Sequence, residues 1–362
     1  MASPPSWLNT SDSTLADCSP PQPPTATGDP VPTRVVDIDT GVAMVVTDLH
    51  GDLPLYRRYR DVFLELHRQG LAQTLIFTGD LIHSEGTGTA DGSLEIILDL
   101  IQLEAALGSR LIVLLGNHEM PHIYHIPLAK GKFVYTPHFE AVLGPYREAV
   151  LDFFRRRPFF VRTGAGVTIC HAGAFPEAGN PGSMDRLRAF SHAHILSEVE
   201  EELADAHRPA LRTAIEKATQ MPYPELAHLY CSVESIEDPR YDDYLIGVLS
   251  GFRDDFKLLW SAMFSQNEHA GGMGTYTGQV RNLLTDLSRD YHPQRVLVTG
   301  HIGCRNGYRI VANGLHLRVA GGAHAHPTTS AKYLLFDAGQ AIGTTADLIE
   351  GLGSVFGEHR EG

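Results

Sequence analysis

The sequence predicts a layered α/β fold whose strands are at least partly parallel. Short runs of apolar, mostly branched residues alternate along the chain with segments whose apolar residues recur at helical spacing. An order of strand, helix, strand and helix is typical of a sheet that is covered by helices. The strand-like runs are almost continuously apolar, which indicates that they are buried on both faces.

Two segments in the first third of the chain are expected to be helices. Residues 55–69 and 94–107 carry apolar side chains at helical spacing, and Gly70 and Gly108 follow them. Glycine often follows the last helical turn because it adopts a left-handed backbone conformation readily. Further strands are expected near the C-terminus, at residues 307–311, 315–319 and 332–337.

A short polar sequence follows each of five strand-like runs. In chain order these are Asp48-Leu49-His50-Gly51-Asp52 after VAMVV, Gly79-Asp80 after TLIF, Gly116-Asn117-His118-Glu119 after RLIVLL, His171-Ala172-Gly173 after VTIC, and Gly300-His301 after RVLV. Side chains at the carboxyl ends of neighbouring strands converge on one edge of the sheet. Oxygen and imidazole ligands gathered at one point are what a pair of divalent metal ions requires.

The residue types also indicate how two ions would be held. Asp80 is the expected bridge, because one carboxylate has two oxygens and joins two cations. Asp48 and His50 lie two residues apart on an extended strand end, so both face the same side and are expected to bind one ion. The second ion is expected to be bound by an amide oxygen and imidazole nitrogens from Asn117, His171 and His301.

In these sequences the chain resembles the calcineurin-like metallophosphoesterase superfamily and, within it, the phosphoprotein-phosphatase-like branch. The pattern Asp-x-His, Gly-Asp, Gly-Asn-His-(Glu/Asp), His and Gly-His is met in order between residues 48 and 301. The resemblance implies a sandwich of two mixed sheets flanked by helices. It also implies phosphoester hydrolysis by a hydroxide that bridges two divalent ions. In the family pattern Asp80 belongs to both metal sites, and His118 matches the general acid that protonates the leaving oxygen.

Two departures from the family pattern concern substrate binding. The family usually continues Gly-Asp with x-x-Asp-Arg-Gly, whereas here His83 replaces the acid that orients the catalytic histidine and Ser84 replaces the phosphate-binding arginine. Position 303 is Gly303, so the second histidine of the broader superfamily's Gly-His-x-His is missing, which favours the phosphoprotein-phosphatase-like branch. An oxyanion substrate still needs donors. The residues expected to contact it are Asn117, His83, Arg253 and Arg305.

The expected activity is phosphomonoester hydrolysis on a phosphorylated small molecule or phosphoprotein. The expected cofactors are two divalent ions, and mixed oxygen and nitrogen ligation suits Mn, Fe or Zn, with Mg or Ni also possible. One alternative is a phosphodiesterase or dinucleotide pyrophosphatase. Another is a non-catalytic metal-binding scaffold for phospho-ligands, which the missing Asp-Arg pair favours and the complete ligand set disfavours.

A zinc-protease interpretation is disfavoured, although residues 118–122 match His-Glu-x-x-His. That chemistry needs both histidines one turn apart on a helix, whereas here a strand precedes the sequence and Pro121 interrupts it. Four histidines have no counterpart in the family pattern and are expected on the surface or in loops: His122, His125, His324 and His326.

Composition excludes several other classes of protein. The net charge of −14 gives no basic surface for nucleic acid or an anionic membrane. No apolar run is long enough to span a membrane, and the N-terminus lacks a basic stretch followed by an apolar one. The four scattered cysteines fit a reducing cytoplasm, which is the expected location.

The chain is expected to divide into three parts. Residues 1–32 are rich in Pro, Ser and Thr and are expected to form a disordered arm. Residues 33–350 are expected to form the phosphoesterase domain, with a helical insertion at about 178–250 that contains one long helix over 197–219. Residues 351–362 are expected to be a tail.

Overall fold

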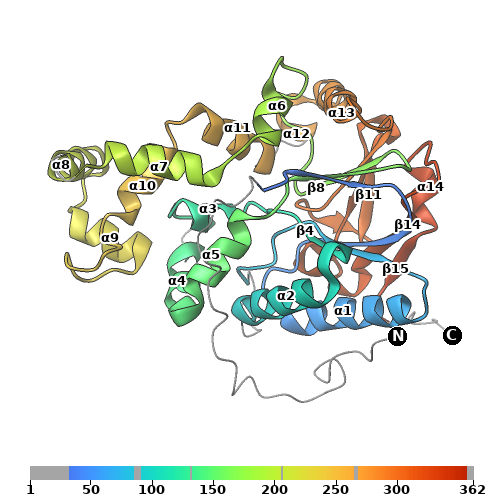
Figure 1. Ribbon diagram of the computed structural model, residues 1–362, viewed down its shortest axis with the longest axis horizontal. Helices are drawn as coiled ribbons and strands as arrows, with labels where there is room; N and C mark the ends of the chain where they lie inside the picture. Colours follow the sequence, from blue (N-terminus) through green and yellow to red (C-terminus); the bar gives the residue numbers. More distant parts are fainter. Residues whose placement is uncertain (1–31, 85–90, 131–132, 205–206, 265–267, 357–362) are drawn as a thin grey trace.

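The computed structural model describes residues 32–84, 91–130, 133–204, 207–264 and 268–356. The predicted arm therefore lies outside the described residues, apart from Pro32. Within the described ranges the fold is two stacked mixed sheets flanked by helices, as the sequence predicts (Figure 1).

The first sheet has five strands in the order β15-β14-β2-β3-β4. Strands β2, β3 and β4 are parallel, and β14 runs antiparallel to both β2 and β15. The strand bounds are β2 (Val42–Val46), β3 (Thr74–Phe77), β4 (Leu111–Val113), β14 (Lys332–Asp337) and β15 (Leu352–Ser354). The segment expected to be a C-terminal tail thus begins with an edge strand, because β15 pairs with the first half of the predicted strand at 332–337.

The second sheet has six strands in the order β1-β7-β8-β9-β12-β11. Strands β8, β9 and β12 are parallel neighbours, so their carboxyl ends lie at one edge. The strand bounds are β1 (Val35–Ile38), β7 (Phe160–Thr163), β8 (Val167–Cys170), β9 (Val296–Thr299), β11 (Tyr308–Val311) and β12 (His316–Val319). Two short ribbons complete the strands described: β5 (Ala129–Lys130) with β6 (Phe133–Val134), and β10 (Cys304–Arg305) with β13 (Ala325–His326).

The strands are apolar on both faces because each sheet is covered on both sides. In β2, Ala43 and Val45 belong to the cluster buried between the two sheets, together with Val298 and other residues of the second sheet. Met44 and Val46 point the other way, into the core that the helices cover. The alternation follows from the two-residue period of a strand.

Helices α1 (Leu53–Arg68) and α2 (Ser93–Leu107) cover the first sheet, close to the predicted bounds (Figure 1). The side chain of Asp52 caps α1 by accepting a hydrogen bond from the amide of Leu55 at 2.9 Å. The helix α13 (Met273–Leu287) lies over the second sheet. The remaining helices of the main body are α3 (Met120–Ile123), α4 (Tyr135–Leu143), α5 (Arg147–Arg155) and α14 (Ala346–Ile349).

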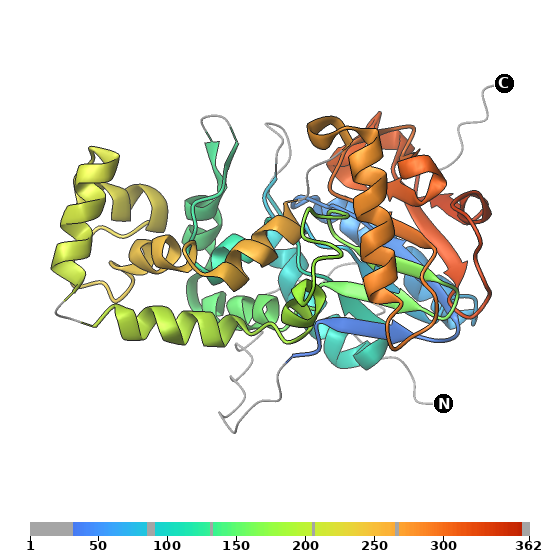
Figure 2. The ribbon, with the colours of Figure 1, turned by 90° about the horizontal axis from the view of Figure 1, so that it is seen from above.

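Residues 183–263 are mainly helical, and α7 to α10 extend away from the sheets in both ribbon views (Figures 1 and 2). The expectation of one helix over 197–219 is wrong, since the chain forms two helices there. Pro209 stands in the first turn of the second helix, where its missing amide hydrogen costs nothing. The helices of this segment are α6 (Ser183–Arg188), α7 (His192–Glu202), α8 (Arg208–Thr219), α9 (Tyr223–Cys231), α10 (Asp243–Ser250) and α11 (Asp254–Met263), and the short α12 (Glu268–Gly271) comes after it. The boundaries of an inserted subdomain remain a prediction.

Among the described helices, none is both long and apolar enough to cross a membrane.

Candidate metal centre

The predicted ligands come from the carboxyl ends of strands in both sheets. Asp48 follows β2, Asp80 follows β3 and Asn117 follows β4 in the first sheet, whereas His171 follows β8 and His301 follows β9 in the second. Each group of strands is parallel, so the ends meet at one edge. The structure therefore brings these residues together where the two sheets meet.

Asp80 lies between two groups of ligands. Its Oδ1 is 3.4 Å from Nε2 of His171, and its Oδ2 is 3.9 Å from Nε2 of His50. The ligand atoms of Asp80, His171 and His301 all lie within 4.8 Å of one another, as do those of His50, Asp80 and His118. One carboxylate thus faces both groups, which is the arrangement that a bridging ligand needs.

The contacts of His171 test whether the residues fit a cation. Nδ1 is 2.9 Å from the carbonyl oxygen of Thr78, and Nε2 is 2.7 Å from Oδ1 of Asn117. Burial lowers the pKa of His171 to about 4, although Asp48 partly opposes this, so the ring is neutral near pH 7 and has one N–H. Nδ1 donates this N–H to Thr78. In the present orientation of the Asn117 amide, Nε2 then faces Oδ1 of Asn117 with no proton between the two atoms. A cation at Nε2 resolves this conflict.

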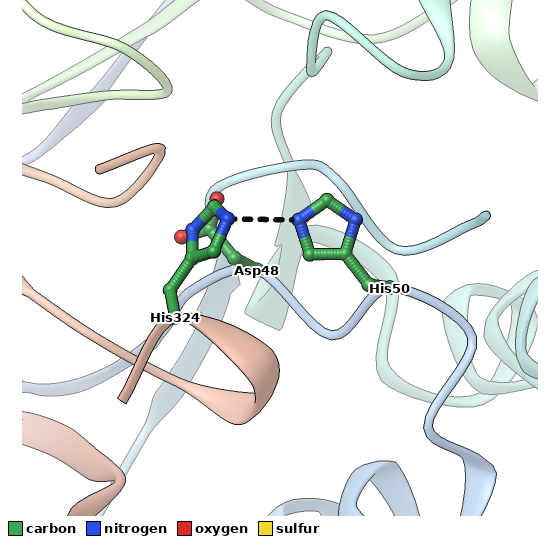
Figure 3. A group of neighbouring side chains, drawn as sticks. All are labelled: Asp48, His50 and His324. Atoms are coloured by element: carbon green, nitrogen blue, oxygen red, sulfur yellow. Dashed lines mark hydrogen bonds and ion pairs between the residues drawn. The ribbon is translucent and has the colours of Figure 1, made fainter. Parts of the chain in front are cut away.

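A further histidine, His324, lies in the first ligand group. It belongs to the short 3-10 helix after β12, η5 (Gly322–His324), and its Nδ1 is 3.4 Å from Oδ1 of Asp48. Its Nε2 is 3.2 Å from Nε2 of His50, and Figure 3 shows the two rings facing each other beside the Asp48 carboxylate. The ligand atoms of these three residues lie within 4.8 Å of one another.

Four of the candidate ligands, and the neighbouring His83, have a strained backbone. Positive φ angles occur at Asp48 (34°), His50 (47°), Asp80 (52°), His83 (71°) and His301 (65°). Residues with side chains adopt this region at a cost of order 1–3 kcal/mol each, and it persists where the surrounding structure enforces it. At the four candidate ligands the chain turns sharply just after a strand, which directs the side chain to the shared edge.

Two glycines allow the ligand loops to approach closely. A Cβ added at Gly116 would overlap the backbone nitrogen of Asp80, and one added at Gly300 would overlap Oδ2 of Asp48. Only glycine fits at such contacts.

Backbone hydrogen bonds also fix the ligand loops. The amide of His301 donates to both oxygens of Asp48, at 2.8 and 2.9 Å. The carboxylate of Glu119 accepts from the amides of Asp80 (2.9 Å), Leu81 (2.7 Å) and Gly116 (3.0 Å). Glu119 is therefore a structural acceptor here, which leaves the zinc-protease alternative without its general base.

The ionisation states suit metal binding. Burial raises the pKa of Asp48, but His324, His171 and His50 outweigh it, and the net pKa lies below the usual range. Burial lowers the pKa of His301 to about 3, with a further contribution from His171. Ionised carboxylates and neutral imidazoles are the forms that bind metal ions.

His118 and His83 lie beside the metal ligands. The backbone amide of His118 donates to Oδ1 of Asp80 at 3.0 Å, and its Nδ1 is 3.0 Å from Nδ1 of His83. His83 is only 2% exposed, and its other nitrogen contacts His122 at 2.9 Å. This geometry does not support His83 as a substrate-binding residue, because both ring nitrogens are occupied inside the protein.

The two arginines expected to bind phosphate lie in different places. Arg253 precedes α11, and its Nη2 donates to Glu202 of α7 at 2.5 Å. Arg305 is exposed on β10, paired in register with His326 on β13. His324 lies two residues before His326. Of the two arginines, it is therefore Arg305 that lies on a ribbon next to a loop with a candidate ligand.

The expectation that four histidines lie on the surface or in loops is only partly right. His326 is exposed and His125 is half-buried, but His122 is fully buried on α3 and His324 contacts Asp48. No local spacing rule links His324 to the other ligands, so only the tertiary fold reveals it. The one sequence feature beside His324 that hints at a close contact is the Gly321-Gly322 pair, since a Cβ at either glycine would crowd the backbone of residues 47–48.

Comparison with known proteins agrees with this fold. The family model for calcineurin-like phosphoesterase matches residues 42–232, just over half of the chain. The chain therefore belongs to the calcineurin-like phosphoesterase family and is a phosphoester hydrolase. The family implies divalent metal ions, for which the strand-end residues provide candidate ligands.

A solved structure shares this fold. A protein serine/threonine phosphatase from Saccharomyces cerevisiae with similarity to human phosphatase PP5 is 11% identical, with a TM-score of 0.50 over 89% of this chain and 81% of that chain. A cold-active protein-tyrosine phosphatase of a psychrophilic Shewanella species is 13% identical, with a TM-score of 0.41 over 88% of this chain and 85% of that chain. No curated protein shows significant sequence similarity to the chain.

Proposed function

We propose that the protein is a phosphomonoesterase with a dinuclear metal centre. The observation that carries the proposal is the position of Asp80, whose two oxygens face His171 on one side and His50 on the other. When bound, a pair of divalent ions would lower the pKa of a water held between them and so supply the nucleophile. Mixed oxygen and nitrogen ligation suits Mn, Fe or Zn.

The ligands divide into two sets that share Asp80. Asp48, His50 and His324 supply the first set, so that His324 provides a nitrogen where the sequence motif has Gly303. The second set consists of Asn117, His171 and His301.

The remaining residues act on the substrate. His118 is placed to donate a proton to the leaving oxygen, since it lies in a group with His50 and Asp80. Asn117 and Arg305 are the proposed phosphate contacts. Arg253 is less suited, because Glu202 already pairs with its charge.

A substrate and metal panel tests the proposal. Purified protein is assayed with p-nitrophenyl phosphate, bis-p-nitrophenyl phosphate, a dinucleotide and phosphopeptides, with Mn, Fe, Zn, Mg or Ni added after chelation. Metal-dependent turnover of the monoester above the diester supports a phosphomonoesterase. A preference for the diester or dinucleotide contradicts it in favour of a phosphodiesterase or pyrophosphatase.

The non-catalytic scaffold remains the second candidate, because Ser84 stands where the family has a phosphate-binding arginine. Metal binding without turnover of any phosphoester in the same panel is the result that this candidate requires.

A further inference from the structure

A continuous line of side-chain contacts leads from His118 into the protein interior. Nδ1 of His118 is 3.0 Å from Nδ1 of His83, and Nε2 of His83 is 2.9 Å from Nε2 of His122. Nδ1 of His122 is 2.9 Å from Oε1 of Glu140 on α4. Nε of Arg147 on α5 donates to Oε2 of Glu140 at 2.7 Å. Two imidazoles, those of His83 and His122, thus connect the proposed general acid to one carboxylate.

The line is enclosed by aromatic rings. The three histidines and Glu140 are between 0% and 8% exposed. Tyr135 stacks on His83 at 5.1 Å with an interplanar angle of 15°, and the edge of Phe139 meets His122 at 5.0 Å. Because the rings are packed and buried, each nitrogen that faces a neighbour in the line must be satisfied by that neighbour.

The carboxylate fixes the direction of every hydrogen bond in the line. Burial raises the pKa of Glu140, but His122 and Arg147 outweigh this and lower it to about 2, so the group is ionised and only accepts. Nδ1 of His122 therefore donates, and in a neutral ring, which has a single N–H, Nε2 accepts. His83 in turn donates from Nε2 and accepts at Nδ1, which leaves His118 to donate from Nδ1.

We propose that Glu140 and His122 act through His83 as positioning residues that keep a proton on Nδ1 of His118 and leave its Nε2 for the reaction. The proposal rests on the proposed function, in which His118 is the general acid. In the reactive form Nε2 has taken up a proton from solvent; when it gives this proton to the leaving oxygen, the ring returns to neutral imidazole and keeps its other proton on Nδ1, where His83 accepts it. The line replaces the direct carboxylate that the family motif places at position 83.

Replacement of Glu140 by glutamine is expected to reverse the direction of every hydrogen bond in the line. Arg147 only donates, so it takes the amide oxygen, and the amide NH2 then faces Nδ1 of His122. Each histidine must switch its proton to the other nitrogen, so Nδ1 of His118 becomes an acceptor. Every hydrogen bond in the line keeps a partner after this reversal, so we expect the variant to fold. Its effect on the reaction then reports the positioning of His118 and not a loss of packing.

The test compares two monoesters that differ in their need for a general acid. p-Nitrophenolate leaves without protonation, whereas phenolate leaves poorly unless it is protonated. General acid catalysis contributes about 10²–10⁴-fold, so we expect Glu140→Gln to lower kcat for phenyl phosphate at least tenfold while kcat for p-nitrophenyl phosphate changes less than about threefold. The matched control is Glu104→Gln, which alters a carboxylate paired with Arg157 at 2.8 Å instead and should leave the ratio unchanged.

The same substitution in a His83→Asp variant checks that Glu140 acts on His118 through His83. Oδ1 of an aspartate and Nδ1 of a histidine are both one bond beyond Cγ, so His83→Asp places a carboxylate oxygen beside His118. In that background Glu140→Gln should no longer change the ratio of the two rates. An equal loss in both backgrounds, or an equal loss on both substrates, overturns the proposal.

A spectroscopic measurement stands independently of turnover. Nitrogen NMR shifts of isotope-labelled histidine report which ring nitrogen carries the proton, with the His118 signal assigned by His118→Gln. We expect a proton on Nδ1 in the wild type and on Nε2 in Glu140→Gln. If Glu140→Gln does not fold, His122→Gln interrupts the same line and should lower the same rate ratio. An inactive wild type with the expected shifts contradicts the proposed function alone, whereas an active wild type with unchanged shifts contradicts the positioning role.

Discussion

The amide of His301 donates to both carboxylate oxygens of Asp48, at 2.8 and 2.9 Å, and this contact joins the two sheets at the metal centre. Asp48 follows β2 of the first sheet and His301 follows β9 of the second. Both are proposed ligands, one in each set. The geometry of one set therefore depends on the geometry of the other.

Replacement of Gly300 by alanine should disturb both sets, because its Cβ would overlap Oδ2 of Asp48. We expect a loss of about 1–3 kcal/mol in unfolding free energy, as for an overpacked site, and reduced metal content. Urea denaturation and elemental analysis measure the two effects. The control is Gly278→Ala in α13, where a Cβ meets nothing within 4 Å and stability should rise by roughly 0.5–1 kcal/mol. Unchanged metal content in Gly300→Ala would contradict the shared geometry.

Removal of the His324 imidazole should weaken the first metal set alone. We expect His324→Ala to lower the affinity for one ion at least about tenfold, which is about 1.4 kcal/mol, while the second ion stays bound. Metal titration followed by elemental analysis separates the two sites. The control is His326→Ala, which removes an exposed imidazole two residues away. Two fully retained ions in His324→Ala would show that it is not a ligand.

Substitution of each arginine in turn should show which of the two binds the phosphate group of the substrate. Arg305→Ala is expected to raise KM for p-nitrophenyl phosphate about tenfold with a smaller change in kcat, the sign of lost uniform binding. Arg253→Ala should leave KM unchanged and cost no more than about 1 kcal/mol, because its pair with Glu202 is partly exposed. The reverse result would place the phosphate beside α11.

Stability should fall between about pH 4 and pH 7 because of Asp243. Burial raises its pKa from 3.8 to about 7, although Arg147 partly opposes this. The folded state therefore holds this proton more tightly than the unfolded state, so its contribution is complete below pH 3.8 and is lost as the pH rises to about 7. We expect Asp243→Asn to flatten this decline in urea denaturation, whereas the exposed Asp254→Asn should not. An unchanged slope in Asp243→Asn contradicts the shifted pKa.

Local patterns were sufficient to predict most of the fold. The apolar runs before Asp48, Asp80 and His171 are buried strands, and their parallel pairing brings the strand ends together. The apolar spacing continues across the helix boundary near Pro209 and so does not predict it, whereas the proline fits the first turn of a new helix and not a helix interior.

The site could be predicted only where its residues follow strands in recognisable motifs. His324 follows β12 after two glycines, and nothing local relates it to Asp48. His122 and Glu140 meet only because α3 and α4 pack around His83. Such contacts depend on tertiary packing, which spacing along the chain does not encode.

The most direct test of the central claim measures metal content and p-nitrophenyl phosphate turnover together, in wild type and Asp80→Asn, before and after chelation. We expect two ions per chain in the active wild type, loss of activity with chelation and recovery when metal is restored. Asp80→Asn should lose both affinity and rate, because one of the two oxygens that face the ligand sets becomes an NH2 group and the negative charge is lost. Full turnover by metal-free wild type, or two bound ions with full rate in Asp80→Asn, would contradict the dinuclear centre.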